Sequence, residues 1–343
     1  MDSASEKGKM KKVFFVHPKS STFIQADLDL LSRHYDVRSL DVGKFKRSFK
    51  NKLIVAYRLF RGVLWSDVSF SWFADEHARG AVRLSRMFGR PSIVVVGGYE
   101  VAKLPEIGYG SQLDSKKAGT VQFILKNATV ILAVSRFTQQ EIGALSSEKQ
   151  VEMVYNGVDT DVFIPLSPKD DMALTVGEIN KNTLRLKGFQ TFVESAAALP
   201  NVRFVVVGPS PDGAVDQLKT AAPKNVEFTG AVPNEKLREM YAKAKVYCQL
   251  SMYESFGMAL VEAMSCGCVP VVADSGALPE VVGDTGVVVP FGDVASTSKA
   301  IQNALLRGDG SKARERAKKM FSGDIREREL VRIINGLSPI QPS

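Results

Sequence analysis

Residues 253–270 read Y-E-S-F-G-M-A-L-V-E-A-M-S-C-G-C-V-P, and their order predicts a loop, a helix and a buried strand in succession. The helix-forming residues that follow Phe256 predict a helix beginning near that residue, with Ser255 as its N-cap. Gly267 is a typical helix end, and the apolar run after it is typical of a short buried strand. A helix start beside a glycine offers free backbone N–H groups and the positive end of the helix dipole, which together suit a phosphate group.

Two acidic residues, Glu254 and Glu262, bracket the predicted start of this helix. Glu254 falls in the loop, where its carboxylate could accept a hydrogen bond from a sugar hydroxyl. Glu262 falls about two turns into the helix, where it could accept from a ribose hydroxyl. The alternative is that Glu254 is a loop charge and Glu262 a solvated helix residue. Because the helix around Glu262 is otherwise apolar, a carboxylate there requires a polar partner, and both acids are candidate ligand-binding residues.

The chain has 343 residues, enough for two domains, with the 45% apolar and 24% charged content of a soluble globular protein. Its apolar runs are much shorter than the roughly 18 residues that a membrane-spanning helix needs. Residues 1–10 lack the apolar segment of a secretory signal and are expected to form a disordered tail. The three cysteines are expected to be small buried residues in a reducing cytosol, which predicts a cytoplasmic protein.

Positive charge is concentrated in the first half of the chain. Residues 1–150 contain 24 Lys and Arg against 14 Asp and Glu, whereas residues 151–343 contain 21 against 23. Such asymmetry suggests nucleic acid, an anionic membrane surface or an acidic substrate as a partner. Residues 44–64 are the most basic stretch, and large apolar side chains alternate with the charges. This stretch could lie on an anionic bilayer, or it could be an ordinary amphipathic helix packed on a sheet with solvated charges.

Strand and helix patterns alternate in both halves of the chain, which predicts an α/β protein with two Rossmann-like, doubly wound domains facing a cleft. A C-terminal helix is expected to cross back to the first domain. The predicted segments are a tail at 1–10, an N-terminal domain at 11–155, a linker at 156–171, a C-terminal domain at 172–320, and a C-terminal helix and tail at 321–343.

Two further groups of polar residues are candidates for a site. Tyr99 and Glu100 follow the apolar strand 91–96, at the kind of strand end where open α/β sheets bind ligands, and Glu100 is either a substrate contact or a loop charge. Two D-x-D pairs, at 27–29 and 159–161, could in principle hold a cation on a diphosphate. The first pair falls in a predicted helix and the second in the linker, so the sequence predicts no metal site.

Several short motifs in the second half share one order and spacing with a known family. They are Asn156-Gly157-Val158-Asp159, Lys187-Gly188, Phe204 to Gly208, Phe228-Thr229-Gly230, Glu254 to Glu262, Ala263 to Gly267, Pro270 to Ala273, Ser275-Gly276, Pro279-Glu280 and Gly286. Over about 130 residues this half resembles the retaining, nucleotide-sugar-dependent glycosyltransferases of family 4, the group 1 glycosyl transferases, which have the GT-B fold. The first half resembles them only loosely. The resemblance implies that the domain at 11–155 binds the acceptor and the domain at 172–320 binds the donor.

The resemblance implies a hexosyltransferase that moves a sugar from a UDP- or GDP-hexose to a glycan or lipid-linked acceptor hydroxyl, with retention of configuration. It implies no catalytic metal and no cofactor beyond the donor, and a protein that can lie peripherally at the inner membrane face. Glu254 would bind donor hydroxyls, Lys187 would neutralise the diphosphate leaving group, and Glu262 would hold the ribose. The other residues that the resemblance assigns to donor binding are Ser255, Phe256, Gly257, Met258, Gly230 and Val232.

The chain departs from the family pattern at two positions. Glu178 follows Gly177 where the family usually has an arginine, and Arg185 is the nearby residue that could supply the second positive charge. The loop of Tyr99 and Glu100 stands where the family often has a histidine. These departures leave open an altered acceptor or a catalytically impaired family member. A related GT-B enzyme, such as a non-hydrolysing nucleotide-sugar epimerase, is a separate alternative. A non-enzymatic nucleic-acid-binding protein is a further alternative, but the chain carries no recognised motif for it, so nucleic acid is not an expected partner.

Overall fold

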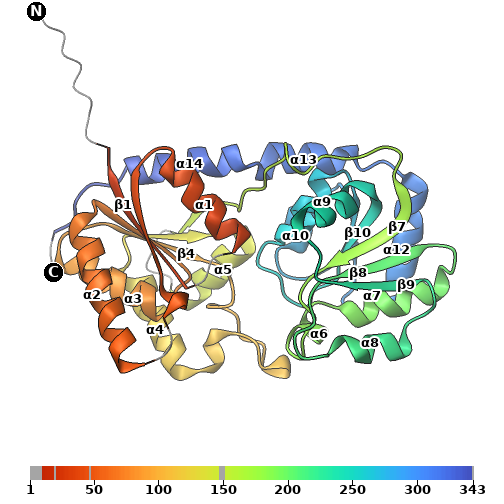
Figure 1. The fold of residues 1–343 in the computed structure, drawn as a ribbon, viewed down its shortest axis with the longest axis horizontal. Helices are drawn as coiled ribbons and strands as arrows, with labels where there is room; N and C mark the ends of the chain where they lie inside the picture. The colour runs from red at the N-terminus through yellow and green to blue at the C-terminus, as the bar shows by residue number, and fades with distance from the viewer. Residues whose placement is uncertain (1–9, 19–20, 46–47, 147–150, 342–343) are drawn as a thin grey trace, which may run out of the picture.

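The structure is a computed structural model that describes residues 10–18, 21–45, 48–146 and 151–341. It consists of two parallel six-stranded sheets, each with helices on both faces, placed side by side along the molecule (Figure 1). The predicted fold of two doubly wound α/β domains is therefore confirmed. The expected tail at 1–10 lies, apart from Met10, outside the described residues.

The N-terminal domain has the strand order β2-β1-β3-β4-β5-β6, with all strands parallel. Helix α1 and the C-terminal helix α14 cover one face of the sheet, and α2 to α5 cover the other. Strands β3 and β4 are buried along their whole length, as their continuous apolar or small residues require. The elements are β1 (Lys12–His17), α1 (Thr22–Ser32), β2 (Asp36–Asp41), α2 (Phe49–Trp65), β3 (Val68–Trp72), α3 (Glu76–Met87), β4 (Ser92–Val96), α4 (Ser115–Asn127), β5 (Val130–Ala133), α5 (Arg136–Leu145) and β6 (Val151–Met153).

The C-terminal domain has the strand order β12-β11-β10-β7-β8-β9, again all parallel. Strand β7 begins at Asp170, inside the segment that the sequence predicts as linker. The elements are β7 (Asp170–Val176), α6 (Thr183–Leu186), α7 (Phe189–Ser195), β8 (Arg203–Val207), α8 (Val215–Ala221), β9 (Val226–Gly230), α9 (Asn234–Lys243), β10 (Ala244–Gln249), α10 (Met258–Ser265), β11 (Val269–Ala273), α11 (Leu278–Val282), β12 (Val287–Val289), α12 (Val294–Arg307), α13 (Ser311–Phe321) and α14 (Gly323–Asn335).

The chain crosses between the domains twice, at two points that lie together. The first crossing passes through Val158, and the second passes between α13 and α14 at Ser322, whose extended backbone separates the two helices. The Val158 amide donates to the Phe321 carbonyl at 2.8 Å, and the Gly323 amide donates to the Val158 carbonyl at 3.0 Å. Helix α13 packs on α10 of the C-terminal domain, whereas α14 packs on α1 of the N-terminal domain.

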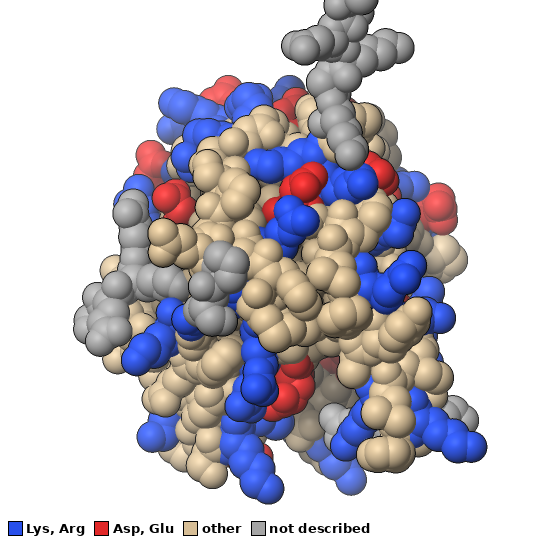
Figure 2. Space-filling model, turned by 90° about the vertical axis from the view of Figure 1, so that its left-hand side faces the viewer, with Lys and Arg blue, Asp and Glu red and all other residues tan. Residues whose placement is uncertain are grey.

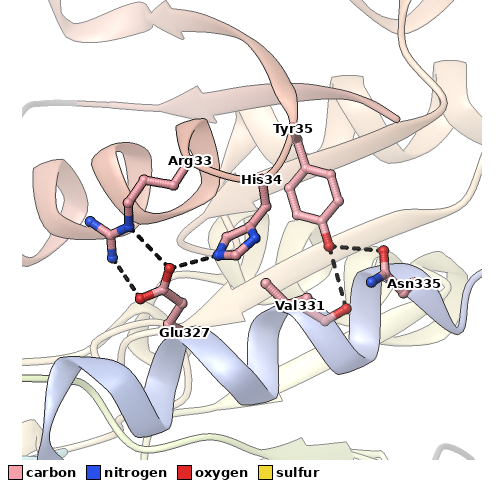
Figure 3. A network of polar contacts seen from close by, with 6 residues as sticks. All are labelled: Arg33, His34, Tyr35, Glu327, Val331 and Asn335. Carbon is pink, nitrogen blue, oxygen red and sulfur yellow. Dashed lines mark hydrogen bonds and ion pairs between the residues drawn. The ribbon is translucent and has the colours of Figure 1, made fainter. Parts of the chain in front are cut away.

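Polar contacts fix α14 on the N-terminal domain (Figure 3). Arg33 donates to both carboxylate oxygens of Glu327, at 3.0 and 2.6 Å, and His34 Nε2 lies 2.6 Å from the same carboxylate. About two turns further along α14, the Tyr35 hydroxyl donates to Asn335 Oδ1 at 3.0 Å. These groups are partly exposed, so they contribute modestly to stability but set the register of α14 on the sheet.

A buried ion pair lies beneath the same helix. Arg326 donates from Nε and Nη2 to the two carboxylate oxygens of Asp27, at 2.5 and 2.7 Å, and the two side chains are only 4% and 1% exposed. Trp72 Nε1 also donates to Asp27, at 2.9 Å, and Arg326 Nη1 donates to the carbonyl of Tyr155. Asp27, the first acid of one D-x-D pair, thus ties the C-terminal helix to the end of strand β3.

Among the described residues, no helix has both the length and the apolar character needed to cross a bilayer.

Candidate active site

Each sheet has a point where consecutive connections leave in opposite directions. In the C-terminal sheet, β7 has β8 on one side and β10 on the other, and in the N-terminal sheet, β1 has β2 on one side and β3 on the other. Open α/β sheets bind ligands in the crevice at the carboxyl ends of such strands. The strand ends from both domains line one cavity of about 360 Å³ between the domains. Its lining residues are Phe23, Trp72, Phe73, Gly97, Asn156, Val176, Gly177, Glu178, Lys187, Gln249, Glu254, Ser255, Phe256, Gly257, Met258 and Ala259.

A larger surface hollow of about 580 Å³ lies on the C-terminal domain, lined in part by Asp171 and Lys245 near the starts of β7 and β10. Ligands of parallel sheets bind at the opposite, carboxyl edge. The interdomain cavity is therefore the candidate active site, although it is the smaller of the two.

Lys187 and Glu254 form the charged centre of the cavity. Lys187 Nζ donates to Glu254 Oε2 at 2.7 Å, and both side chains are mostly buried. Gln249 Nε2 donates to the same oxygen at 3.1 Å, and Tyr247 orients that amide by donating to its Oε1 at 2.8 Å. Within the part of the chain that the structure describes, the side-chain donors to this carboxylate converge on Oε2, which leaves Oε1 for a ligand.

Backbone contacts bring the two charged residues together although they are 67 positions apart in the sequence. The Met252 amide donates to the Leu186 carbonyl at 2.7 Å, which joins the loop before Glu254 to the loop that carries Lys187. Gly188 has a φ of +66°, and a Cβ at this position would lie 1.9 Å from the Leu250 carbonyl oxygen. Only glycine fits so close an approach in a left-handed conformation, which accounts for the Lys187-Gly188 pair.

The start of helix α10 differs from the prediction. The helix begins at Met258 and its N-cap is Gly257, with a φ of +95°, rather than Ser255. The Ser255 carbonyl instead accepts a hydrogen bond from the Thr138 hydroxyl of the N-terminal domain at 3.4 Å. Serine is a strong N-cap in isolation, but here the contact between domains holds it in the preceding loop, and the glycine supplies the sharp turn.

Glu262 lies about one turn after the start of α10 and does not line the cavity. Burial raises the pKa of its carboxyl to about 7, and the buried hydroxyl of Tyr241 is its polar neighbour. Gly230 and Val232 also lie outside this cavity, and Val232 lines a separate hollow of about 270 Å³. For Glu262, Gly230 and Val232 to contact the ribose and the base, the nucleoside of the donor would have to extend beyond this cavity.

The raised pKa of Glu262 predicts a stability that depends on pH. Its ordinary value of 4.5 applies to the unfolded chain, so between pH 4.5 and 7 the folded protein holds a proton that the unfolded protein has released. The contribution of this proton to the free energy of unfolding is fully present below pH 4.5 and is lost as the pH rises through 7. The free energy of unfolding falls by about 3 kcal/mol over this range. We expect Glu262→Gln to flatten the fall in unfolding free energy between pH 5 and pH 8, measured by urea denaturation. Glu315→Gln, at an exposed position on α13, should retain the wild-type slope, and an equal slope in all three proteins would contradict the assignment.

The N-terminal wall of the cavity is aromatic and was not predicted. Phe23, Trp72 and Phe73 line it, with the rings of Phe23 and Trp72 5.0 Å apart. Phe73 adopts a φ of +68°, a left-handed conformation that costs energy in a residue other than glycine. Its ring lies where a Cβ on Gly97 would stand, so Gly97 leaves room for it. Because these aromatic residues are spread along the sequence, only the strand order reveals that they meet.

Glu100 and Tyr99, the predicted acceptor-side residues, do not line the cavity. Glu100 is buried and accepts hydrogen bonds from the amides of Ala74 and Gly97, at 3.0 and 3.1 Å, and burial raises its pKa. It thereby holds the loops that carry Phe73 and Gly97, which is a structural contact rather than the substrate contact that the sequence allowed. Tyr99 is exposed and packs edge-on against Tyr109.

The arginine that was expected to compensate for Glu178 is also outside the cavity. Arg185 is exposed on the short helix α6, whereas Glu178 itself lines the wall together with Lys187. The cavity is thus lined by two acidic residues and one lysine, a balance that is less positive than a diphosphate site would favour.

The second D-x-D pair caps its own turn, because Asp159 accepts hydrogen bonds from the amides of Asp161 and Val162. No cluster of three or more His, Cys, Asp or Glu residues suited to a metal occurs among the described residues.

A further contact between the domains involves Glu280 of α11, known from the sequence only as part of a motif. Its carboxylate accepts hydrogen bonds from the amides of Arg136 and Phe137 at the N-terminus of α5, at 2.9 and 3.1 Å. The Tyr155 hydroxyl donates to it as well, at 2.6 Å. A carboxylate at a helix N-terminus is favourable for the helix dipole, so this contact helps to hold the two domains together.

Two Rossmann-like domains that face a ligand cleft, with the C-terminal helix returned to the first domain, define the GT-B class of folds. Solved structures with this architecture superpose along nearly the whole chain. Sucrose-phosphate synthase from Thermosynechococcus elongatus has a TM-score of 0.79 at 17% identity, covering 95% of this chain and 98% of that chain. HepE of Anabaena in complex with UDP-glucose has a TM-score of 0.76 at 17% identity, covering 95% and 100%. At these identities the likeness establishes the fold alone.

The sequence comparisons point to one family for the C-terminal domain. Residues 159–320 match the model of glycosyl transferases group 1. It is 32% identical over 196 residues to a component of the phosphatidylinositol N-acetylglucosaminyltransferase of Arabidopsis thaliana, covering 54% of this chain and 43% of that protein. It is 28% identical over 264 residues to alpha-maltose-1-phosphate synthase of Mycolicibacterium smegmatis, covering 67% of each. The chain thus spans less than half of the plant relative.

Proposed function

We propose that the protein transfers a hexose from a nucleotide diphosphate sugar to an acceptor hydroxyl, with retention of configuration and without a catalytic metal. The observation that carries this proposal is the Lys187–Glu254 pair at the strand ends β7 and β10, next to the free N-terminus of α10, within a cavity shared by both domains. The family match of residues 159–320 supports it, as does the structure of HepE, which was solved in complex with UDP-glucose.

Each group has a chemical task in such a transfer. Lys187 would neutralise the charge that develops on the diphosphate as the sugar leaves, because a fixed positive charge in a partly dry site lowers the barrier. The backbone N–H groups at the start of α10, near Gly257 and Met258, would bind the phosphate oxygens. Glu254 would accept from sugar hydroxyls through Oε1, and Lys187 and Gln249 hold it in place for this through Oε2. The aromatic wall of Phe23 and Phe73 would face the acceptor.

The acceptor is proposed to be a glycan or a lipid-linked sugar, used by a cytoplasmic protein that can associate with the inner face of a membrane. The positive balance of residues 1–150 supports the membrane association. The relative in Arabidopsis, by its name, acts on phosphatidylinositol, which is a lipid.

A donor screen tests the proposal. UDP- and GDP-hexoses are added singly, and the melting temperature is measured, because a bound donor stabilises the folded state by mass action. The donor that shifts it is then incubated with candidate acceptors, and NMR records the anomeric configuration of the product. Transfer with retention is expected. Interconversion of the donor sugar without an acceptor would show an epimerase instead, and no shift with any donor would show an impaired site.

Glu178 is expected to weaken donor binding in this site. Glu178 lines the same cavity as Lys187, at an exposed position where its carboxylate accepts a hydrogen bond from Asn180, and its charge would repel a diphosphate bound there. We expect Glu178→Gln to tighten UDP binding by roughly tenfold at low salt and by less at high salt, measured by isothermal titration calorimetry. Glu235→Gln, at an exposed position on α9, should bind UDP as the wild type does. Weaker binding by Glu178→Gln would show instead that Glu178 contacts the ligand favourably.

A further inference from the structure

Helix α2 carries apolar residues on two separate faces. Leu59, Gly62 and Val63 are buried, and Gly62 lies against the ring of Phe14 on strand β1. This face accounts for the packing of the helix on the sheet. One helix needs only one such face to join a core, so apolar residues on a second face require another explanation.

The second face forms a continuous exposed stripe, here called the outer stripe. Its residues are Phe49, Leu53, Tyr57, Phe60 and Leu64, which follow one another at helical spacing and are 76, 57, 62, 39 and 42% exposed. With Ile54, which borders the stripe, this helix supplies six of the fifteen exposed large hydrophobic residues of the described chain. Scattered exposed apolar residues are ordinary on a protein surface, whereas a contiguous row of them marks an interaction site.

Basic residues flank the outer stripe. At about 100° per residue, Lys50 and Arg61 project beside it on one side and Lys52 on the other, and all three are exposed. The sequence from 42 to 66 contains seven Lys and Arg and no Asp or Glu. In the described parts of the chain, Lys50, Lys52 and Arg61 make no ion pair. Figure 2 shows the end of the molecule that carries α2, where Lys and Arg side chains outnumber Asp and Glu and are spread among uncharged residues.

We infer that the outer stripe of α2 docks on an anionic lipid bilayer, with the aromatic and aliphatic side chains in the headgroup boundary and the flanking cations on lipid phosphates. A helix with an apolar row and basic flanks lies in the plane of such an interface. A second copy of this chain would fit less well, because two outer stripes face to face would bring basic flanks against each other. Docking on a bilayer does not itself depend on the proposed function. What rests on the proposed function is the purpose of the docking, which is to bring the acceptor side of the cleft to a membrane.

Vesicle flotation with the full chain tests this surface. Vesicles of phosphatidylcholine with phosphatidylglycerol should carry the wild type to the top of the gradient, and pure phosphatidylcholine should carry much less. The variant Leu53→Ser/Tyr57→Ser/Phe60→Ser should bind the anionic vesicles at least ~10-fold more weakly. Lys50→Ser/Arg61→Ser should lose about tenfold or more at low salt and little at high salt. Leu306→Ser removes a side chain that is 80% exposed on α12 of the other domain, and it should float as the wild type does.

Three outcomes would overturn the inference. These are equal flotation of the triple variant and Leu306→Ser, no flotation of the wild type, and a wild-type dimer in sedimentation velocity that the triple variant converts to monomer. Circular dichroism and UDP binding of each variant, measured without vesicles, show that it is folded. The inference and the proposed function fail separately, because flotation requires no transfer, and transfer to a soluble acceptor requires no vesicle.

Discussion

Lys187→Ala should lower the turnover of sugar transfer by about 10²–10³-fold, which corresponds to about 3–4 kcal/mol of transition-state stabilisation. The reason is that Lys187 is the only ammonium group on the wall of the interdomain cavity among the described residues. Its loss would leave the leaving diphosphate beside two carboxylates, Glu178 and Glu254. The measurement is the initial rate of nucleotide release with the donor that the thermal screen identifies, together with the UDP dissociation constant.

Lys181→Ala is the matched control, because Lys181 lies exposed on the same segment between β7 and α7 and does not line the cavity. It should change turnover by less than about twofold. Glu254→Gln should cost about as much as Lys187→Ala, and the double variant should cost less than the two losses multiplied, because the residues act as a pair. If both lysine variants lost activity equally, or if Lys187→Ala remained fully active, the site would lie elsewhere.

Arg326→Ala should lower the free energy of unfolding by about 3–5 kcal/mol, because it leaves the carboxylate of Asp27 buried without its cation. The two side chains are almost completely buried, and Trp72 also depends on Asp27 for its hydrogen bond. Urea denaturation measures the change. Since Trp72 lines the cavity, we also expect weaker donor binding in this variant.

Arg328→Ala on the same helix is the control, because its side chain is exposed, and it should alter stability by no more than about 0.5 kcal/mol. Should Arg326→Ala fail to fold, Asp27→Asn/Arg326→Met keeps the prediction testable. Removal of both charges should recover part of the loss, because no unpaired ion remains. Equal stability of Arg326→Ala and Arg328→Ala would contradict the role of the buried pair.

The fold could be predicted from the sequence because its strands are short, apolar and regularly separated by helices. What the local pattern missed was a place where the other domain intervenes. Ser255 has the chemistry of an N-cap, but its carbonyl accepts a hydrogen bond from Thr138 across the cleft.

The candidate site was predictable only in part. Glu254 was a candidate from its own loop, but Lys187 came from a resemblance to a family, since nothing local relates two residues 67 positions apart, and the structure places them in contact. Arg185 was chosen for being close to Lys187 in sequence, but the short helix α6 turns it to solvent. Glu100 was ambiguous because a glutamate in a loop can face either a ligand or backbone amides. The aromatic wall follows from strand order, which no single segment encodes.

The paired crossings at Val158 and Ser322 limit how the two domains can move. A single linker would let one domain swing in any direction, but two hydrogen-bonded segments restrain both twist and sideways displacement. The remaining easy movement is a rotation about an axis through the pair. Asn156 lies next to that axis and lines the cavity, so it should stay nearly fixed during such a rotation, whereas Gly98 and Ser255, which meet across the cleft, should separate. We therefore expect the cleft to open for the entry and release of ligands by this one rotation.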